Sequence, residues 1–155
     1  MHDPAAIPVM IIDDEPHLRI TAGQTLELAG YAPEPHASAE AALEQLAPDF
    51  PGVVVSDIRM PGMDGMALLR EVRLRDPDLP VILITGHGDI STAVEAMREG
   101  AWDFLEKPFA AERLVEVVRR GVEKRRLSLE NRELKAELEA QQSALGPRLV
   151  GRTPA

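Results

Sequence analysis

The sequence predicts an α/β protein in which helices cover both faces of a five-stranded parallel β-sheet. Two observations carry this prediction. Short apolar runs alternate along the chain with stretches whose apolar residues recur at helical spacing. The runs at residues 7–12, 53–56 and 81–85 are almost continuously apolar, which is typical of strands that are buried on both faces. We therefore expect a doubly wound sheet whose ligand site lies at the carboxyl ends of its strands.

Each element has its own local signal. The helix expected at residues 16–29 has apolar residues spaced by four and three, and Gly30 ends it. Ser38 and Asp64 are suitable N-caps for the next two helices. The expected strands cover residues 7–12, 31–36, 53–56, 81–85 and 102–106. The expected helices cover residues 16–29, 39–46, 65–75, a stretch from a cap at Asp89 or Ser91 to residue 99, and a last stretch from Ala111.

Composition narrows the class of protein. A chain of 155 residues with 45% hydrophobic residues suits one domain with an extension. The absence of cysteine excludes disulfides and thiolate metal sites, and it fits a cytoplasmic location. No apolar run reaches the roughly 18 residues of a membrane span. The net charge of −9 and the 3% of aromatic residues argue against nucleic-acid binding by this chain.

Polar residues stand at the end of four expected strands. Asp13 and Asp14 follow the first strand, Asp57 follows the third, Thr85 ends the fourth and Lys107 follows the fifth. Any one of them alone is an ordinary loop residue. Because parallel strands share one carboxyl edge, we expect all five to converge there.

Such a cluster has a specific chemistry. Neighbouring carboxylates repel each other unless a cation neutralises them, and carboxylate oxygens suit Mg²⁺. An ionised Asp57 beside that metal can attack a phosphoryl group and form an aspartyl-phosphate. Lys107 can neutralise the oxygens of the transferred group, and Thr85 can donate a hydrogen bond to them.

The segments VMIIDDEPHLR, VVVSDIRMPGMDG, VILITGHGD and FLEKPF resemble, in this order, the receiver domain of two-component response regulators. The resemblance implies the flavodoxin-like strand order 2-1-3-4-5 and a sensor histidine kinase as phosphoryl donor. It implies Asp57 as the phosphoacceptor, Asp14 as a direct Mg²⁺ ligand and Asp13 as a mainly water-mediated one. Asp57 itself and the main-chain carbonyl of Arg59 would complete the ligands from the protein.

The resemblance also implies a switch. Thr85 and Lys107 would contact the phosphoryl group, and the Lys107–Pro108 peptide bond would be cis. Phe104 takes the place of the switch aromatic, with no hydroxyl to form a hydrogen bond. Phosphorylation would draw Thr85 inward and let Phe104 rotate, which changes the surface formed by the fourth helix, the fifth strand and the fifth helix.

A helical extension is expected beyond the sheet. Leucines spaced by seven, four and seven residues, with one asparagine at an intervening core position, form an a/d heptad pattern. These residues are Leu127, Asn131, Leu134, Leu138 and Leu145. We expect a parallel coiled-coil homodimer, supported by the surface of the fourth helix, fifth strand and fifth helix. A solvated single helix is the alternative, because about three heptads are marginal alone. The basic cluster Lys124, Arg125 and Arg126 is expected to be solvated surface.

The expected organisation is a receiver domain at residues 1–122, a coiled-coil linker at 123–145 and the start of a further domain at 146–155. The segment LVGRTPA resembles the opening of the AAA+ ATPase module of sigma-54-dependent activators, which implies a truncated regulator with an AAA+ partner domain. Within that family, TLELAGY, SDIRMPGMDG, TGHGDI and EKRRLSLENREL resemble regulators of C4-dicarboxylate transport genes, in which the unphosphorylated dimer holds the ATPase inactive.

Two other functions stay open. An aspartate-nucleophile phosphohydrolase would be an enzyme rather than a phosphoacceptor domain, but such enzymes carry an acid two residues after the nucleophile, where this chain has Arg59. A dimerisation module that works without phosphorylation is the other alternative. The complete set of acidic, hydroxyl and lysine side chains argues against it.

Overall fold

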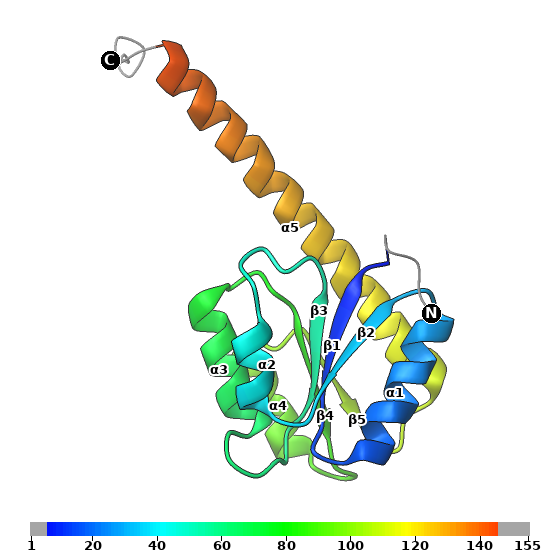
Figure 1. The fold of residues 1–155 in the computed structure, drawn as a ribbon. Coiled ribbons are helices and arrows are strands. Elements are labelled where there is room, and N and C mark those ends of the chain that lie inside the picture. The colour runs from blue at the N-terminus through cyan, green and yellow to red at the C-terminus, as the bar shows by residue number, and fades with distance from the viewer. Residues whose placement is uncertain (1–5, 146–155) are drawn as a thin grey trace.

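A five-stranded parallel sheet in the order β2-β1-β3-β4-β5 forms the centre of the molecule (Figure 1). The structure is a computed structural model and describes residues 6–145. The strands are β1 (Pro8–Ile12), β2 (Ala32–His36), β3 (Val53–Asp57), β4 (Val81–Thr85) and β5 (Asp103–Glu106). The helices are α1 (Pro16–Leu28), α2 (Ala39–Gln45), α3 (Gly65–Arg75), α4 (Ile90–Arg98) and α5 (Ala111–Leu145). The predicted fold class and strand order are confirmed.

Two apolar clusters hold the helices against the two faces of the sheet. One joins β1, β3 and β4 to α2, α3 and α4, and its largest side chains include Met10, Leu68 and Leu83. The other joins the opposite face to α1 and α5, through residues such as Leu26 and Leu114. Figure 1 shows this arrangement, with α2, α3 and α4 on one side of the sheet and α1 and α5 on the other. Every residue of β3 and β4 is buried, as their apolar runs predict.

The predicted bounds of the elements agree with the structure to within one residue. Two of the predicted caps are also present. The Ser38 hydroxyl accepts a hydrogen bond from the backbone N–H of Ala41, and the Asp64 carboxylate accepts one from that of Ala67. One difference matters for the site. The third strand was predicted to end at residue 56, but it ends at Asp57, so the sheet fixes the backbone position of Asp57.

Helix α5 is 35 residues long and continues past the amino ends of the strands, away from the rest of the molecule (Figure 1). Its first part covers the sheet with Leu114, Val118 and Val122, which are buried. The helix runs without interruption through the predicted domain boundary at residue 122. Among residues 6–145, no helix combines the length and hydropathy that crossing a bilayer requires. The segment predicted to open an AAA+ module, 146–155, lies outside the described residues.

The prediction that Lys124, Arg125 and Arg126 form solvated surface is wrong for Arg125. Its side chain is fully buried, and it donates hydrogen bonds to the Phe50 carbonyl and to Asp76. Lys124 is half-buried, with its ammonium 5.9 Å from the centre of the Trp102 ring. Only Arg126 is an exposed residue, paired with Glu123 on the same helix. The three consecutive basic residues lie in three different environments, because successive residues of a helix face different directions.

Candidate functional site

The carboxyl edge of the sheet brings the predicted acidic residues together. Asp13 follows β1 directly, and Asp57 ends the neighbouring strand β3. One carboxylate oxygen from each of Asp13, Asp14 and Asp57 lies within 4.8 Å of the others. Lys107 follows β5 and places its ammonium 3.1 Å from Oδ2 of Asp57. We call Asp13, Asp14 and Asp57 the acid site.

Asp57 is a buried carboxylate at the carboxyl edge of the sheet. Its residue is 7% exposed, so its charge needs partners. Lys107 Nζ donates to Oδ2, and the backbone N–H of Arg59 points toward Oδ1 at 3.4 Å. These donors hold both oxygens of the carboxylate in a defined orientation. A carboxylate whose orientation is fixed in this way is suited to act as a nucleophile.

Asp13 shows the electrostatic strain of the acid site. Burial raises the pKa of the Asp13 carboxyl above its usual range, and the nearby charge of Asp57 raises it further. The backbone N–H of Glu15, which donates to Asp13 Oδ1 at 2.9 Å, acts in the opposite direction and lowers that pKa. The net increase in the pKa means that burial, together with the charge of Asp57, disfavours the ionised form of Asp13.

The donor set of the acid site fits a hard divalent cation. All three side chains offer carboxylate oxygens, and among residues 6–145 no histidine or cysteine belongs to the group. Mg²⁺ prefers one or two carboxylates together with water and phosphate oxygens, whereas zinc sites use mainly histidine and cysteine. Asp14 is exposed and Asp13 is buried, so the two offer oxygens from different depths of the site. Magnesium is therefore the metal that these residues are best suited to hold.

Thr85 and Phe104 lie on the neighbouring strands β4 and β5, offset by two residues, because Thr85 pairs with Glu106 and Phe104 pairs with Leu83. The Thr85 side chain is buried, and its hydroxyl lies 3.4 Å from the Leu105 carbonyl, the acceptor that it faces in this structure. A groove of about 580 Å³ is lined by Thr85, Phe104 and the apolar residues of α4. The two residues thus border one space, as a switch that couples them requires.

One other predicted feature is present beside the site, since the Lys107–Pro108 peptide bond is cis. The Arg59 side chain is exposed and pairs with Asp89, at 3.1 Å, a contact that the sequence analysis did not predict. A role for the Arg59 main-chain carbonyl as a metal ligand stays a prediction.

Gly65 contributes to the site in a way that the sequence analysis missed. Its backbone N–H donates to the Ile58 carbonyl at 2.8 Å, which brings the first turn of α3 against the end of β3. A Cβ atom at this position would lie 2.5 Å from the carbonyl oxygen of Asp57. Only glycine therefore permits this approach. The signal was available, since glycine is an unfavourable residue inside a helix unless the backbone must come close to something.

Comparison with known proteins agrees with this geometry. The sequence profile described as response regulator receiver domain matches residues 9–119. The C4-dicarboxylate transport transcriptional regulatory protein DctD of Rhizobium meliloti (strain 1021) is 56% identical over 150 residues, which is 97% of this chain and 32% of that protein. The chain thus spans about a third of the length of this curated relative.

Solved structures show the same fold. The crystal structure of NtrX from Brucella abortus in complex with ADP is 40% identical, with a TM-score of 0.74 over 83% of this chain and 30% of that one. The structure of the response regulator StyR is 34% identical, with a TM-score of 0.86 over 93% of this chain and 73% of that one.

Proposed function

This chain belongs to the response regulator receiver family, and on that premise we propose that Asp57 accepts a phosphoryl group from a sensor histidine kinase. An oxygen of Asp57 attacks the phosphorus, and the bond from phosphorus to the imidazole nitrogen of the donor breaks. The nitrogen keeps the electron pair of that bond. The observation that carries the proposal is that the buried Asp57 carboxylate pairs with Lys107 at 3.1 Å and lies close to two further acids, Asp13 and Asp14.

The residues around Asp57 divide the work of the transfer. Asp13 and Asp14, with the Arg59 main-chain carbonyl, would hold Mg²⁺, which supplies positive charge to the oxygens of the transferred group. Lys107 supplies a second positive charge from the opposite side. Thr85 gives up its contact with the Leu105 carbonyl and donates to a phosphoryl oxygen. The chain provides positioning and charge rather than an acid or base.

The switch follows from the groove beside Thr85. When Thr85 moves toward the phosphoryl group, space opens between α4 and β5, and the Phe104 ring turns into it. Three apolar side chains on α4, Ile90, Val94 and Met97, are between 42% and 69% exposed and border or adjoin this groove. A surface of this kind is suited to a partner, so the rotation of Phe104 alters a contact between two chains.

The linker part of α5 supports dimerisation. Leu127, Leu134 and Leu138, which we call the apolar seam, are each at least 50% exposed within the described part of one chain. In the heptad that places Leu134 at d and Leu138 at a, Asn131 occupies an a position. Glu130 and Lys135 then occupy g and e positions, which face each other across a parallel pair of helices. A second copy of this chain therefore offers both apolar and charge complementarity.

The wider context of the proposal comes from the relatives. DctD is named as a regulator of C4-dicarboxylate transport, and this chain is 56% identical to about a third of it. We accordingly place this chain in the cytoplasm as the receiver and linker of a sigma-54-dependent activator, in which the dimer controls an AAA+ ATPase domain. Phosphorylation of Asp57 rearranges the dimer and releases the ATPase.

Beryllofluoride binding tests the proposal directly, because this anion occupies the place of a phosphoryl group on a carboxylate. We expect binding by the wild-type chain only when Mg²⁺ is present. Asp57→Ala should abolish it, together with labelling by a small acyl phosphate, whereas Glu44→Gln, a change of an exposed acid on α2, should alter neither. Equal labelling of Asp57→Ala and the wild type would show that the phosphoacceptor is another residue.

A phosphohydrolase is the competing function, and the residue two positions after Asp57 argues against it. The position two residues after Asp57 holds Arg59, whose side chain pairs with Asp89. No acid therefore stands where a general acid for turnover is needed. An aspartyl-phosphate that persists through many minutes of incubation would separate the two functions, since a hydrolase would release the phosphate quickly.

A further inference from the structure

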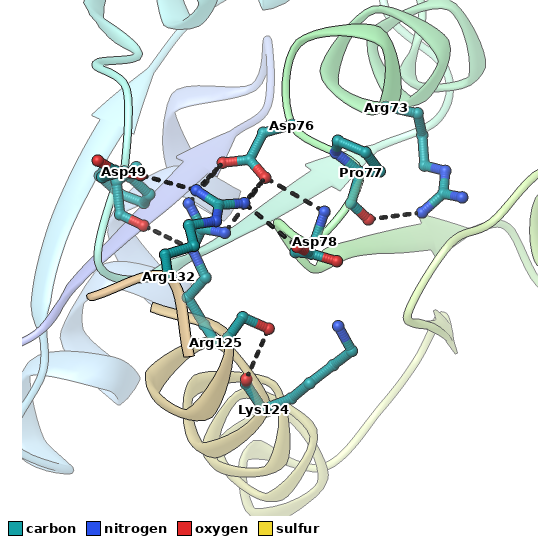
Figure 2. Close-up of polar contacts among 10 residues, drawn as sticks. Asp49, Arg73, Asp76, Pro77, Asp78, Lys124, Arg125 and Arg132 are labelled. Carbon is teal, nitrogen blue, oxygen red and sulfur yellow. Dashed lines mark hydrogen bonds and ion pairs between the residues drawn. The ribbon is translucent and has the colours of Figure 1, made fainter. Parts of the chain in front are cut away.

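Asp76 lies between two arginines of the linker helix, far from the acid site. It caps the end of α3, near the amino ends of the strands, and its carboxylate accepts hydrogen bonds from both Arg125 and Arg132 (Figure 2). The pair with Arg125 is bidentate, with distances of 2.6 and 3.3 Å. We call Asp76, Arg125 and Arg132 the arginine clamp. It joins α5 to a part of the chain that is about 50 residues earlier in sequence.

Arg125 is the buried member of the clamp. Its side chain has no exposed surface, and its Nε donates to the Phe50 carbonyl at 2.8 Å in addition to its bonds with Asp76. A guanidinium keeps its charge even when it is buried, so it depends on a carboxylate partner. Asp76 is the carboxylate that supplies this partner. The position of α5 at residue 125 is thus defined by three hydrogen bonds to two separate loops.

Arg132 extends the attachment two helical turns further along α5. It donates to Asp76, to Asp49 at 2.7 Å and to Asp78 at 3.3 Å. These acids come from two loops, one before β3 and one before β4. The Arg132 side chain is 36% exposed, so its removal leaves no buried hole. Two attachment points on one helix determine both its direction and its rotation about its own axis.

The rotation decides where the apolar seam faces. Leu127 follows Arg125 by two residues, and Leu134 follows Arg132 by two residues. Each leucine therefore lies about 200° around the helix from an arginine of the clamp. The exposure of Leu127, Leu134 and Leu138 agrees with this placement on the far side of the helix.

We infer that the arginine clamp is a positioning device, which holds the linker helix in one direction and one rotation so that the apolar seam faces a second copy of this chain. The identity of the partner that the apolar seam binds rests on the dimer proposed above. The attachment of the linker helix by the arginine clamp does not depend on that dimer. It places the receiver bodies on the outer sides of a central helix pair. It also makes the linker helix and the receiver body one rigid unit, so a change in how the receivers pair turns the helices with it.

Distances between two spin labels on one chain test the clamp. The chain has no cysteine, so Leu28→Cys on α1 and Glu139→Cys on α5 give two unique label sites, both exposed. Dilution with excess unlabelled protein confines the measurement to pairs within one chain. We expect one narrow distance peak from the otherwise unchanged chain, and the loss of that peak in Arg132→Gln and in Asp76→Asn. Arg126→Gln, a neighbouring arginine outside the clamp, should keep it.

The outcomes separate the inference from the proposed dimer. A narrow peak that persists in both clamp variants overturns the inference, whatever the mass of the protein in sedimentation. If Asp76→Asn does not fold, Arg132→Gln decides alone, because its side chain is partly exposed. A chain that sediments as a monomer yet loses its narrow peak in Arg132→Gln supports the clamp and contradicts the dimer.

Discussion

The ammonium of Lys107 and the carboxylate of Asp57 are 50 residues apart in sequence and 3.1 Å apart in the structure. The pair is possible because β3 and β5 are parallel strands of one sheet, so their carboxyl ends lie at the same edge. Lys107 places a positive charge beside the carboxylate that would receive a phosphoryl group. The pair is therefore the part of the site that a single substitution tests best.

Lys107→Met should slow the labelling of Asp57 by a small acyl phosphate about 100-fold, because it removes a positive charge from the oxygens of the transferred group. The rate at saturating Mg²⁺ is the quantity to measure. Lys135→Met, which removes an exposed lysine from the linker, is the matched control and should react at the wild-type rate. An unchanged rate in Lys107→Met would assign the role of the cation to another residue.

Asp13→Asn should have opposite effects with and without metal. In a chelating buffer the variant should melt at a higher temperature than the wild type, because it no longer buries the Asp13 charge and no longer sets that charge against Asp57. Added Mg²⁺ should raise the melting temperature of the wild type, since it binds only the folded state. In the variant the affinity for Mg²⁺ should fall by about tenfold or more, about 1.4 kcal/mol. A variant with wild-type Mg²⁺ affinity would remove Asp13 from the metal site.

The arginine clamp predicts a dependence of stability on pH. Burial raises the pKa of Asp76, but the hydrogen bonds from Arg132 and Arg125 outweigh it and lower the pKa from 3.8 to about 2. A carboxyl whose pKa is lower in the folded state stabilises that state above its unfolded pKa. This stabilisation, about 2 kcal/mol, is fully present above pH 3.8 and is lost as the pH falls through about 2.

Urea unfolding of the wild type and of Asp76→Asn measures this effect. At neutral pH the variant should be less stable by about 3 kcal/mol, because Arg125 is left buried with a weaker partner. The difference in the free energy of unfolding should shrink as the pH approaches 2. Glu44→Gln should follow the wild type at every pH. A difference that stays constant down to that pH would mean that Asp76 is not the group that titrates.

Charged residues in the apolar seam should separate the dimer. In the double variant Leu134→Glu and Leu138→Glu, two leucines that would each contribute about 2 kcal/mol on burial are lost, and like charges face each other. The sedimenting mass should fall toward the 16.9 kDa of one chain. Glu139→Gln, on the outer side of the same helix, should leave the mass unchanged. If the double variant sediments like the wild type, the seam is not the interface.

The sequence alone was sufficient for the elements and for the site at the carboxyl edge. Both depend on local properties of the chain. Apolar runs predict the strands, and Ser38 and Asp64 predict the starts of two helices. The parallel topology then places the carboxyl ends of β1, β3, β4 and β5 at one edge, and this step needs no knowledge of side-chain contacts. For this reason the sequence alone predicts that Asp57 and Lys107 lie at the same edge of the sheet.

Only the tertiary structure decided which charged residues are buried. Arg125 stands between two other basic residues in an acidic, heptad-like stretch, and nothing nearby in sequence distinguishes it. Its partner Asp76 is 49 residues away, and the contact exists because α5 passes the end of α3 at the amino edge of the sheet. A buried ion pair depends on which surfaces meet, and that meeting is a property of the folded chain rather than of any segment of it.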